Sequence, residues 1–249
     1  MRGFLGGSSP TKVYAAIDLM RGGVVRLRKG RANDAKLYPG DPATLAQSWS
    51  RTGIGGLHVV DLDGAFGQGN NLDTIRQIIR SAETPVQVGG GIRTAAVARE
   101  LIEAGADALV VGTVALTDEA TFCQISEIAT LPKIIVALDY RGEDVLIEGW
   151  RQLSGIKLDK ALRRVMGAGV RSFLLTSADR DGMMDGPDVY TVRRVCQRHN
   201  EARIYASGGV RSTTDVAALR DAGAYAVIIG KALLEGALPI SEAIKVGAG

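Results

Sequence analysis

The chain has 249 residues, of which 46% are hydrophobic and 23% charged, with a formal net charge of +3. Its apolar content allows a large core to be buried, while the weak positive charge and the 5% of aromatic residues do not favour a nucleic-acid surface. No apolar run approaches the ~20 residues that a membrane helix needs. The opening MRGFLGGSSP also lacks the apolar core of a signal peptide, so we expect a cytoplasmic protein without a membrane partner.

The two cysteines agree with that expectation. Cys123 and Cys196 fall in segments with a helical pattern, and neither belongs to a CxxC motif or to a His-rich spacing. We therefore predict no disulfide and no zinc site, but buried or half-buried thiols in a reducing compartment.

Eight short apolar segments follow one another along the chain and are predicted to be strands. They are VYAAID (13–18), LHVVDL (57–62), VQVGG (86–90), ALVVGT (108–113), KIIVALD (133–139), SFLLTS (172–177), RIYASG (203–208) and YAVIIG (225–230). Continuous apolar strands, as opposed to alternating ones, are typical of a parallel sheet that is covered on both faces.

Amphipathic helical patterns separate these strands, for example TAAVARELIEAGA at 94–106, where a glycine suits the end of the helix. Eight strand–helix units in about 240 residues predict a closed (β/α)8 barrel. We expect one domain over residues 1–249, with 1–12 as a loose N-terminal extension. The alternative, an open doubly wound sheet, would carry GxGxxG after its first strand, where this chain has DLMRGG at 18–23.

The two halves of the chain repeat each other. GGIR at 90–93 recurs as GGVR at 208–211, and DG at 63–64 recurs as DG at 181–182, both 118 positions later. Gly112 likewise matches Gly230, and the strand-ending Asp18 matches Asp139 with a small slip. Matches in register at four successive strand ends predict a barrel built from two similar half-barrels.

The glycine turns lie where a barrel places its chemistry, in the loops after the strands. Glycine lets the backbone approach an anion, and the following helix offers unpaired N–H groups, so each half is predicted to hold one phosphate. The first phosphate site comprises Gly90, Gly91, Gly112 and Thr113, and the second comprises Ser207, Gly208, Gly209, Gly230 and Lys231. Two such sites predict a small-molecule substrate with a phosphate at each end. The alternative is that these glycines only permit tight packing.

Two carboxylates end matching strands, between the predicted phosphate sites. Asp18 and Asp139 would face each other across the barrel mouth and serve as general acid and general base, one of them with a raised pKa. The alternative for each is a helix cap or a loop-holding hydrogen bond. Asp181, which follows a strand containing Thr176, is predicted to assist proton transfer or to orient the substrate.

Other polar residues have less specific interpretations. Asp61 and Asp63 are predicted to organise their loop, and a metal site is disfavoured because the carboxylates are spread over different strands and no His joins them. His58 is interpreted as a core residue with its hydrogen bonds satisfied, and His199 as a solvated helix end.

Two long connections contain further candidates. Trp150, after the fifth strand, either stacks on a planar ring of the substrate or packs its own loop. Arg26, Arg28 and Lys29, after the first strand, either close over an anionic ligand or are solvated charges.

The motifs together resemble one family of histidine-biosynthesis enzymes, the isomerases of phosphoribosylformimino-aminoimidazole carboxamide ribotide (ProFAR). The resemblance extends from about Val13 to Ile244 and rests on AIDLMRGGVVRLRKG, HVVDLDGAFGQGNN, VGGGIRT, VVGTVAL, VALDY, EGW, TSADRDG, SGGVR and IIGKAL. It implies a (β/α)8 barrel with two-fold internal similarity and a substrate with two phosphates.

The resemblance also implies a reaction and residue roles. The reaction is an Amadori rearrangement of an aminoaldose to an aminoketose, without a cofactor. By matching motif, Asp18 would accept the proton and Asp139 would donate one, supported by Thr176 and Asp181. Arg93 and Trp150 match positions near the substrate.

Some segments depart from the family pattern and keep alternatives open. TSADRDG and GDPATLAQSW are more similar to the sister family, the cyclase of imidazole glycerol phosphate synthase, and Met183 stands where either family has Thr. This leaves the role of Asp181 open. The alternatives are such a cyclase, an isomerase that also acts on phosphoribosylanthranilate, whose members tend to carry SGGIR where this chain has GGGIR, and a non-catalytic barrel that binds a phosphorylated ligand. The sequence does not fix the oligomeric state, although a monomer is favoured.

Overall fold

The computed structural model describes residues 10–28 and 31–249. Most of the expected N-terminal extension, residues 1–9, lies outside the described residues, as do Lys29 and the side chain of Arg28. The first strand begins at Lys12.

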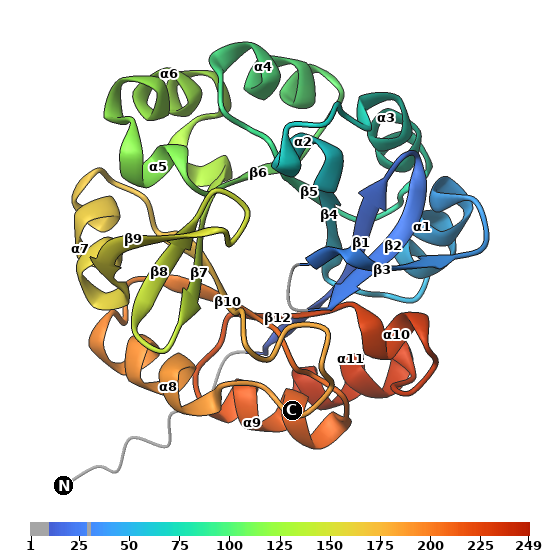
Figure 1. The fold of residues 1–249 in the computed structure, drawn as a ribbon. Helices are drawn as coiled ribbons and strands as arrows, with labels where there is room; N and C mark the ends of the chain where they lie inside the picture. Colours follow the sequence, from blue (N-terminus) through green and yellow to red (C-terminus); the bar gives the residue numbers. More distant parts are fainter. Residues whose placement is uncertain (1–9, 29–30) are drawn as a thin grey trace, which may run out of the picture.

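In the described part of the chain, eight parallel strands close into a ring surrounded by helices (Figure 1). The strands are β1 (Lys12–Met20), β4 (Gly56–Asp61), β5 (Val86–Gly89), β6 (Ala108–Val111), β7 (Ile134–Arg141), β10 (Ser172–Ser177), β11 (Arg203–Ser207) and β12 (Ala226–Ile229). Strand β1 pairs with both β4 and β12, and β7 pairs with β10, so the ring has no free edge. The predicted (β/α)8 barrel is therefore confirmed, and the open sheet is excluded.

The helices that cover the ring follow its strands in order. They are α1 (Pro42–Ser50), α3 (Leu72–Ser81), α4 (Ala95–Glu103), α6 (Glu119–Ala129), α7 (Leu158–Gly167), α8 (Val189–Arg198), α9 (Thr213–Asp221) and α11 (Ile240–Ala248). Shorter helices are α2 (Leu62–Phe66), α5 (Val114–Thr117), α10 (Lys231–Leu234) and the 3-10 turn η1 (Leu131–Lys133). No helix in the described ranges is long and apolar enough to cross a membrane.

Alternation along each strand divides the core into two parts. On β1, Ile17 and Leu19 pack towards the helices, in the large core between strands and helices. Tyr14 and Ala16 belong to a second cluster formed by the other strand face, inside the ring. Tyr14 and Tyr205 meet there edge to face, with 5.6 Å between ring centroids, and Tyr225 packs on Tyr205 at 5.2 Å. Aromatic side chains therefore pack inside the ring towards the start of its strands, and a cavity opens towards the strand ends.

The long connections after β1 and β7 are β-hairpins, which the sequence patterns did not predict. Strands β2 (Gly23–Arg28) and β3 (Arg31–Tyr38) extend from β1, and β8 (Asp144–Ile147) and β9 (Gln152–Lys157) extend from β7. The two hairpins lie on opposite sides of the barrel mouth (Figure 1). The predicted internal repeat thus includes these insertions as well as the barrel strands.

Candidate active site

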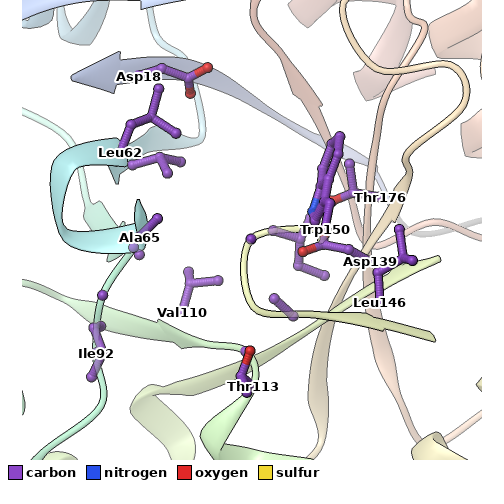
Figure 2. A pocket seen from close by; sticks show the side chains of 18 of the residues that line it. Asp18, Leu62, Ala65, Ile92, Val110, Thr113, Asp139, Leu146, Trp150 and Thr176 are labelled. Carbon is purple, nitrogen blue, oxygen red and sulfur yellow. The ribbon is translucent and has the colours of Figure 1, made fainter. Parts of the chain in front are cut away.

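A cavity of about 220 Å³ opens at the carboxyl ends of the barrel strands. Asp18 lies on one side of it, and Asp139, Thr176 and Trp150 lie on the opposite side (Figure 2). Predicted site residues that line it are Asp18, Gly90, Gly91, Arg93, Gly112, Thr113, Asp139, Trp150, Thr176, Asp181 and Ser207. A much smaller cavity of about 10 Å³ adjoins it and is lined by Ser207, Gly208, Gly209, Gly230 and Lys231 among others. The structure thus brings all fifteen predicted residues to one mouth.

Asp18 is held by a cation that comes from the neighbouring hairpin. Nη1 of Arg26 lies 2.8 Å from Oδ2 of Asp18, and Nη2 lies 3.6 Å from Oδ1 of Asp181. Burial raises the pKa of Asp18 to about 6, although the Arg26 charge opposes this rise and the Asp181 carboxylate adds to it. Burial likewise raises the pKa of Asp181, again against the effect of Arg26.

Arg26 has a larger role in the site than the sequence predicted, because it lies between Asp18 and Asp181. Its side chain is only 9% exposed, so the alternative of a solvated charge is wrong for this residue. A side chain at Gly230 would collide with the Arg26 guanidinium. Arg26 therefore reaches from β2 to the predicted second phosphate site, which we call the second glycine turn. Both faces of β2 are buried around this residue, since Val25 and Leu27 are buried as Arg26 is, and pairing of β2 with β1 brings Arg26 next to Asp18.

Asp139 has neutral partners instead of a cation. Its carboxylate accepts hydrogen bonds from the side chains of Trp150 and Thr176, and Thr176 is its register partner on β10. Burial raises the pKa of Asp139 to about 6; the two hydrogen bonds lower it, and the Asp181 carboxylate raises it further. Trp150 therefore contacts a candidate catalytic group directly, whereas the sequence predicted contact with the substrate or with its own loop.

The buried charge of Asp139 should reduce stability at high pH. The pKa of Asp139 is about 6 in the folded protein, above its ordinary value of 3.8. Its contribution to the free energy of unfolding is therefore complete below pH 3.8 and is lost as the pH rises through about 6. Asp139→Asn should therefore gain up to about 3 kcal/mol of unfolding free energy relative to the parent between pH 4 and pH 8.

Urea unfolding at the two pH values measures this change. The matched control for the aspartate-to-asparagine change is Asp73→Asn on α3, because the Asp73 side chain is 92% exposed. A gain that is equal at both pH values would contradict the assignment of a raised pKa to Asp139.

The first glycine turn, at the predicted first phosphate site that begins with Gly90 and Gly91, is packed closely against neighbouring loops. Gly90 has φ 94°, and a side chain there would collide with the backbone of Asp61, so close packing of two loops requires this glycine. The Arg93 guanidinium donates to the carbonyl oxygens of Gly64 (3.0 Å) and Ala65 (2.6 Å) in α2. Arg93 thus joins two loops while it lines the cavity.

Thr113 and Lys231 occupy matching positions in the two halves, and each tethers a loop. The Thr113 hydroxyl accepts from the backbone N–H of Glu148 at 2.9 Å, which attaches the β8–β9 hairpin to the first turn. Nζ of Lys231 donates to the Gly182 carbonyl at 3.1 Å, which attaches the loop after β10 to the second turn. Gly208 has φ 93°, close to that of Gly90, so the two turns share a backbone conformation.

Asp61 and Asp63 organise loops, as predicted. Asp61 accepts from the backbone N–H groups of Gly64 (3.0 Å) and Asn71 (2.9 Å), and Asp63 accepts from that of Arg21 at 2.6 Å. The Asn71 amide bridges both carboxylates at 2.7 and 2.8 Å. Asn71, which the sequence did not single out, therefore connects the loop after β4 to the hairpin after β1.

Both histidines differ from their sequence interpretation. His58 lines the cavity and is 6% exposed, yet its Nδ1 has no hydrogen-bond partner among the described residues, so it is not satisfied. His199 ends α8 but is buried, so it is not solvated. Cys123 is exposed, and only Cys196 is half-buried. No group of three or more His, Cys, Asp or Glu side chains within the described ranges is arranged to hold a metal ion.

Fold and site together define a (β/α)8-barrel protein whose half-buried carboxylates face a cavity at the strand ends, where enzymes of this fold bind their substrates. Over residues 12–239 the chain matches the model of the family described as histidine biosynthesis protein, and it belongs to that family.

Three similar proteins share the name 1-(5-phosphoribosyl)-5-((5-phosphoribosylamino)methylideneamino)imidazole-4-carboxamide isomerase. The protein of this name from Cenarchaeum symbiosum is 44% identical over 94% of this chain and 99% of its own length. The protein from Halothermothrix orenii is 39% identical over 92% of this chain and 97% of its own length. The protein from Nitrosopumilus maritimus is 36% identical over 93% of this chain and 98% of its own length.

Proposed function

We propose that the protein is the ProFAR isomerase of histidine biosynthesis, which is the activity that the names of its relatives state. The observation that carries the proposal is the pair of half-buried aspartates, Asp18 and Asp139, on opposite sides of one cavity (Figure 2). Both have a pKa of about 6, which suits groups that exchange protons near neutral pH.

The different partners of the two aspartates support different roles. Arg26 favours the ionised form of Asp18, as a proton acceptor requires. Asp139 has no described cation partner, and the nearby Asp181 carboxylate favours its protonated form, as a proton donor requires. Two carboxyl groups in distinct environments are thereby set up for acid and base work.

The proposed reaction needs only these two groups. Asp139 gives its proton to the ribose ring oxygen, and the ring opens to a Schiff base at C1′. Asp18 then takes the proton from C2′, which leaves an enol. A proton added at C1′, together with loss of the enol hydroxyl proton, gives the ketone at C2′. The ring oxygen and C1′ each gain one proton, while C2′ and the enol oxygen each lose one, so substrate and product have the same composition and no oxidant or cofactor is consumed.

Two phosphates are proposed for the substrate, one at each glycine turn. The Arg26 guanidinium packs on Gly230, so the second turn has a positive charge beside its backbone N–H groups. We further propose that the chain acts in the cytoplasm as a single-domain monomer; its two cysteines are free, as a reducing compartment allows.

The alternatives find less support. A cyclase of this fold needs a path for ammonia through the barrel, and the rings of Tyr14, Tyr205 and Tyr225 pack against one another inside the ring of strands. A non-catalytic barrel would have no use for two carboxylates whose removal from water raises their pKa and costs free energy. Growth complementation distinguishes an isomerase that acts only on ProFAR from one that also acts on phosphoribosylanthranilate.

Growth complementation tests the function and its alternatives together. The gene should restore growth without histidine to a bacterial strain that lacks ProFAR isomerase. It should not restore growth without histidine to a strain lacking the cyclase, nor growth without tryptophan to one lacking phosphoribosylanthranilate isomerase. The proposal fails if the first strain does not grow although the folded protein accumulates in it.

The pH dependence of catalysis should be bell-shaped. Because Asp18 must be ionised and Asp139 protonated, kcat/KM should fall on the acid side as Asp18 gains a proton and on the alkaline side as Asp139 loses one. Both pKa values are about 6, so the maximum should lie near pH 6. Initial rates from pH 4.5 to 8.5 measure the profile, and a rate that rises steadily across this range would contradict the assignment.

A further inference from the structure

The tip of the β8–β9 hairpin, residues 148–151, has an unusual backbone where it lines the cavity. Glu148, Gly149 and Trp150 follow one another with φ 55°, 64° and 69°, so three successive residues are in the left-handed region. Only glycine adopts this region without a steric cost, so Glu148 and Trp150 need contacts that hold them there. The conformation of the tip therefore depends on its neighbours.

Two contacts attach the tip to the first half of the barrel. The Thr113 hydroxyl, in the predicted first phosphate site, accepts from the backbone N–H of Glu148 at 2.9 Å. Gly149 packs on α2, where a side chain at this position would lie 3.5 Å from the Phe66 ring. The hydrogen bond from Glu148 is the directional one of the two contacts, and it fixes the first residue of the left-handed run.

The tip places Trp150 on Asp139. Figure 2 shows the Trp150 side chain beside Asp139 and Thr176. The indole and the Thr176 hydroxyl donate to the Asp139 carboxylate, and both hydrogen bonds lower the pKa of Asp139. Burial and the charge of Asp181 act in the opposite direction and raise it. The position of Trp150 therefore affects the pH at which Asp139 loses its proton.

The second half of the barrel has a similar connection at the matching position. Lys231 stands 118 positions after Thr113, and its Nζ donates to the Gly182 carbonyl at 3.1 Å. Gly182 directly follows Asp181, which shares Arg26 with Asp18. In each half, a side chain of the predicted phosphate site is thus bonded to the backbone of a loop that acts on a candidate catalytic aspartate. Recurrence at matching positions argues that the contact of Thr113 with the tip is part of the design of the site.

We propose that Thr113 is a positioning residue whose hydroxyl holds the hairpin tip so that Trp150 stays on Asp139. A hydroxyl has one proton to donate and two lone pairs that accept. Thr113 can therefore accept from Glu148 and donate to a substrate phosphate at the same time. The inference rests on the proposed function and adds a connection between the first phosphate site and the proton donor.

Tryptophan fluorescence of the free protein tests the connection without a substrate. The chain has two tryptophans, so Trp49→Phe leaves Trp150 as the single emitter. In this background the emission should change with a midpoint near pH 6 as Asp139 loses its proton, and Asp139→Asn should abolish the change. Thr113→Val keeps the side-chain shape without the acceptor and should abolish it too, whereas Thr113→Ser should retain it. Thr117→Val is the matched control, because this exposed hydroxyl of α5 donates to the Thr113 carbonyl and not to the hairpin.

Rates with ProFAR separate positioning from phosphate binding. Loss of the Trp150 hydrogen bond should raise the pKa of Asp139, so the alkaline limb of kcat/KM in Thr113→Val should move to higher pH by about one unit. Trp150→Phe should move it equally, and the double variant should move it no further. Loss of a phosphate contact alone would raise KM but leave the limb and the emission change as in the parent, and that result would overturn the inference. So would a parent whose Trp150 emission does not follow Asp139.

Failure of the proposed function would be recognised separately. A protein whose emission behaves as expected but which does not turn over ProFAR would contradict the proposed function and leave the role of Thr113 at the hairpin tip standing. Circular dichroism shows whether each variant is folded. If Thr113→Val does not fold, Thr113→Ala, which also lacks the acceptor, should give the same loss of the emission change, and a retained change would overturn the inference.

Discussion

Asp139→Asn is expected to lower kcat for ProFAR by about 10²–10⁴-fold, the usual contribution of a positioned acid or base. The amide has no proton to give to the ring oxygen, so ring opening would depend on water. Its oxygen still accepts a hydrogen bond, so one of the contacts from Trp150 and Thr176 can persist and the cavity keeps its shape. The effect should therefore appear mainly in kcat and less in KM.

The pH profile of the residual activity identifies the role of Asp139. The parent should lose activity on the alkaline side, whereas Asp139→Asn should not, because the group responsible for that limb is gone. The exposed Asp73 again serves as the control, and Asp73→Asn should behave as the parent. An Asp139→Asn variant with full activity would remove Asp139 from the mechanism.

Asp18→Asn is expected to lower kcat by a similar factor, about 10²–10⁴-fold. The variant lacks the base that takes the C2′ proton, and Arg26 keeps only its 3.6 Å ion pair with Asp181. Here the acid limb of the profile should disappear, since protonation of Asp18 no longer limits the rate.

Thermal unfolding of Asp18→Asn shows whether a loss of activity in this variant results from a loss of the folded structure. The substitution removes one buried charge but leaves Arg26 less well paired, so two opposing effects on stability are expected. If a folded Asp18→Asn variant retains the acid limb, another group must be the base. Asp181, which shares Arg26 with Asp18, would then be the next candidate.

The barrel was predictable because its signal is local. Eight continuous apolar strands separated by amphipathic helices have few ways to bury both faces of a sheet, and a closed parallel barrel is one of them. The internal repeat then placed Asp18 opposite Asp139, since matching strand ends of a doubled half-barrel lie across the mouth. Figure 2 shows this arrangement.

The partners of these aspartates were not predictable in the same way. Whether Arg26 is solvated or buried depends on the pairing of β2 with β1, and the Gly- and Arg-rich connection gives little strand signal. The contact of Trp150 with Asp139 depends on how a second hairpin folds back, where Trp150 itself has φ 69°. Long-range side-chain contacts of this kind follow from tertiary packing, which local patterns do not encode.

One feature of the glycine turns was predictable from the sequence, and another required the structure. Their recurrence suggested anion sites, while the structure adds that Gly90 and Gly209 are also required for the close approach of neighbouring loops. Thr113 and Lys231, selected as phosphate donors, each have a partner within the protein. A phosphate at either turn must therefore share these groups with the loops that they hold, or displace them.

Steady-state turnover of ProFAR by the purified parent protein is the most direct measurement of the central claim. With the chelator EDTA present and no cofactor added, the absorbance change and the mass of the product should show conversion to the aminoketose isomer of identical composition. The proposed function predicts multiple turnovers per protein molecule under these conditions. A folded protein that binds ProFAR but leaves it unchanged would contradict it.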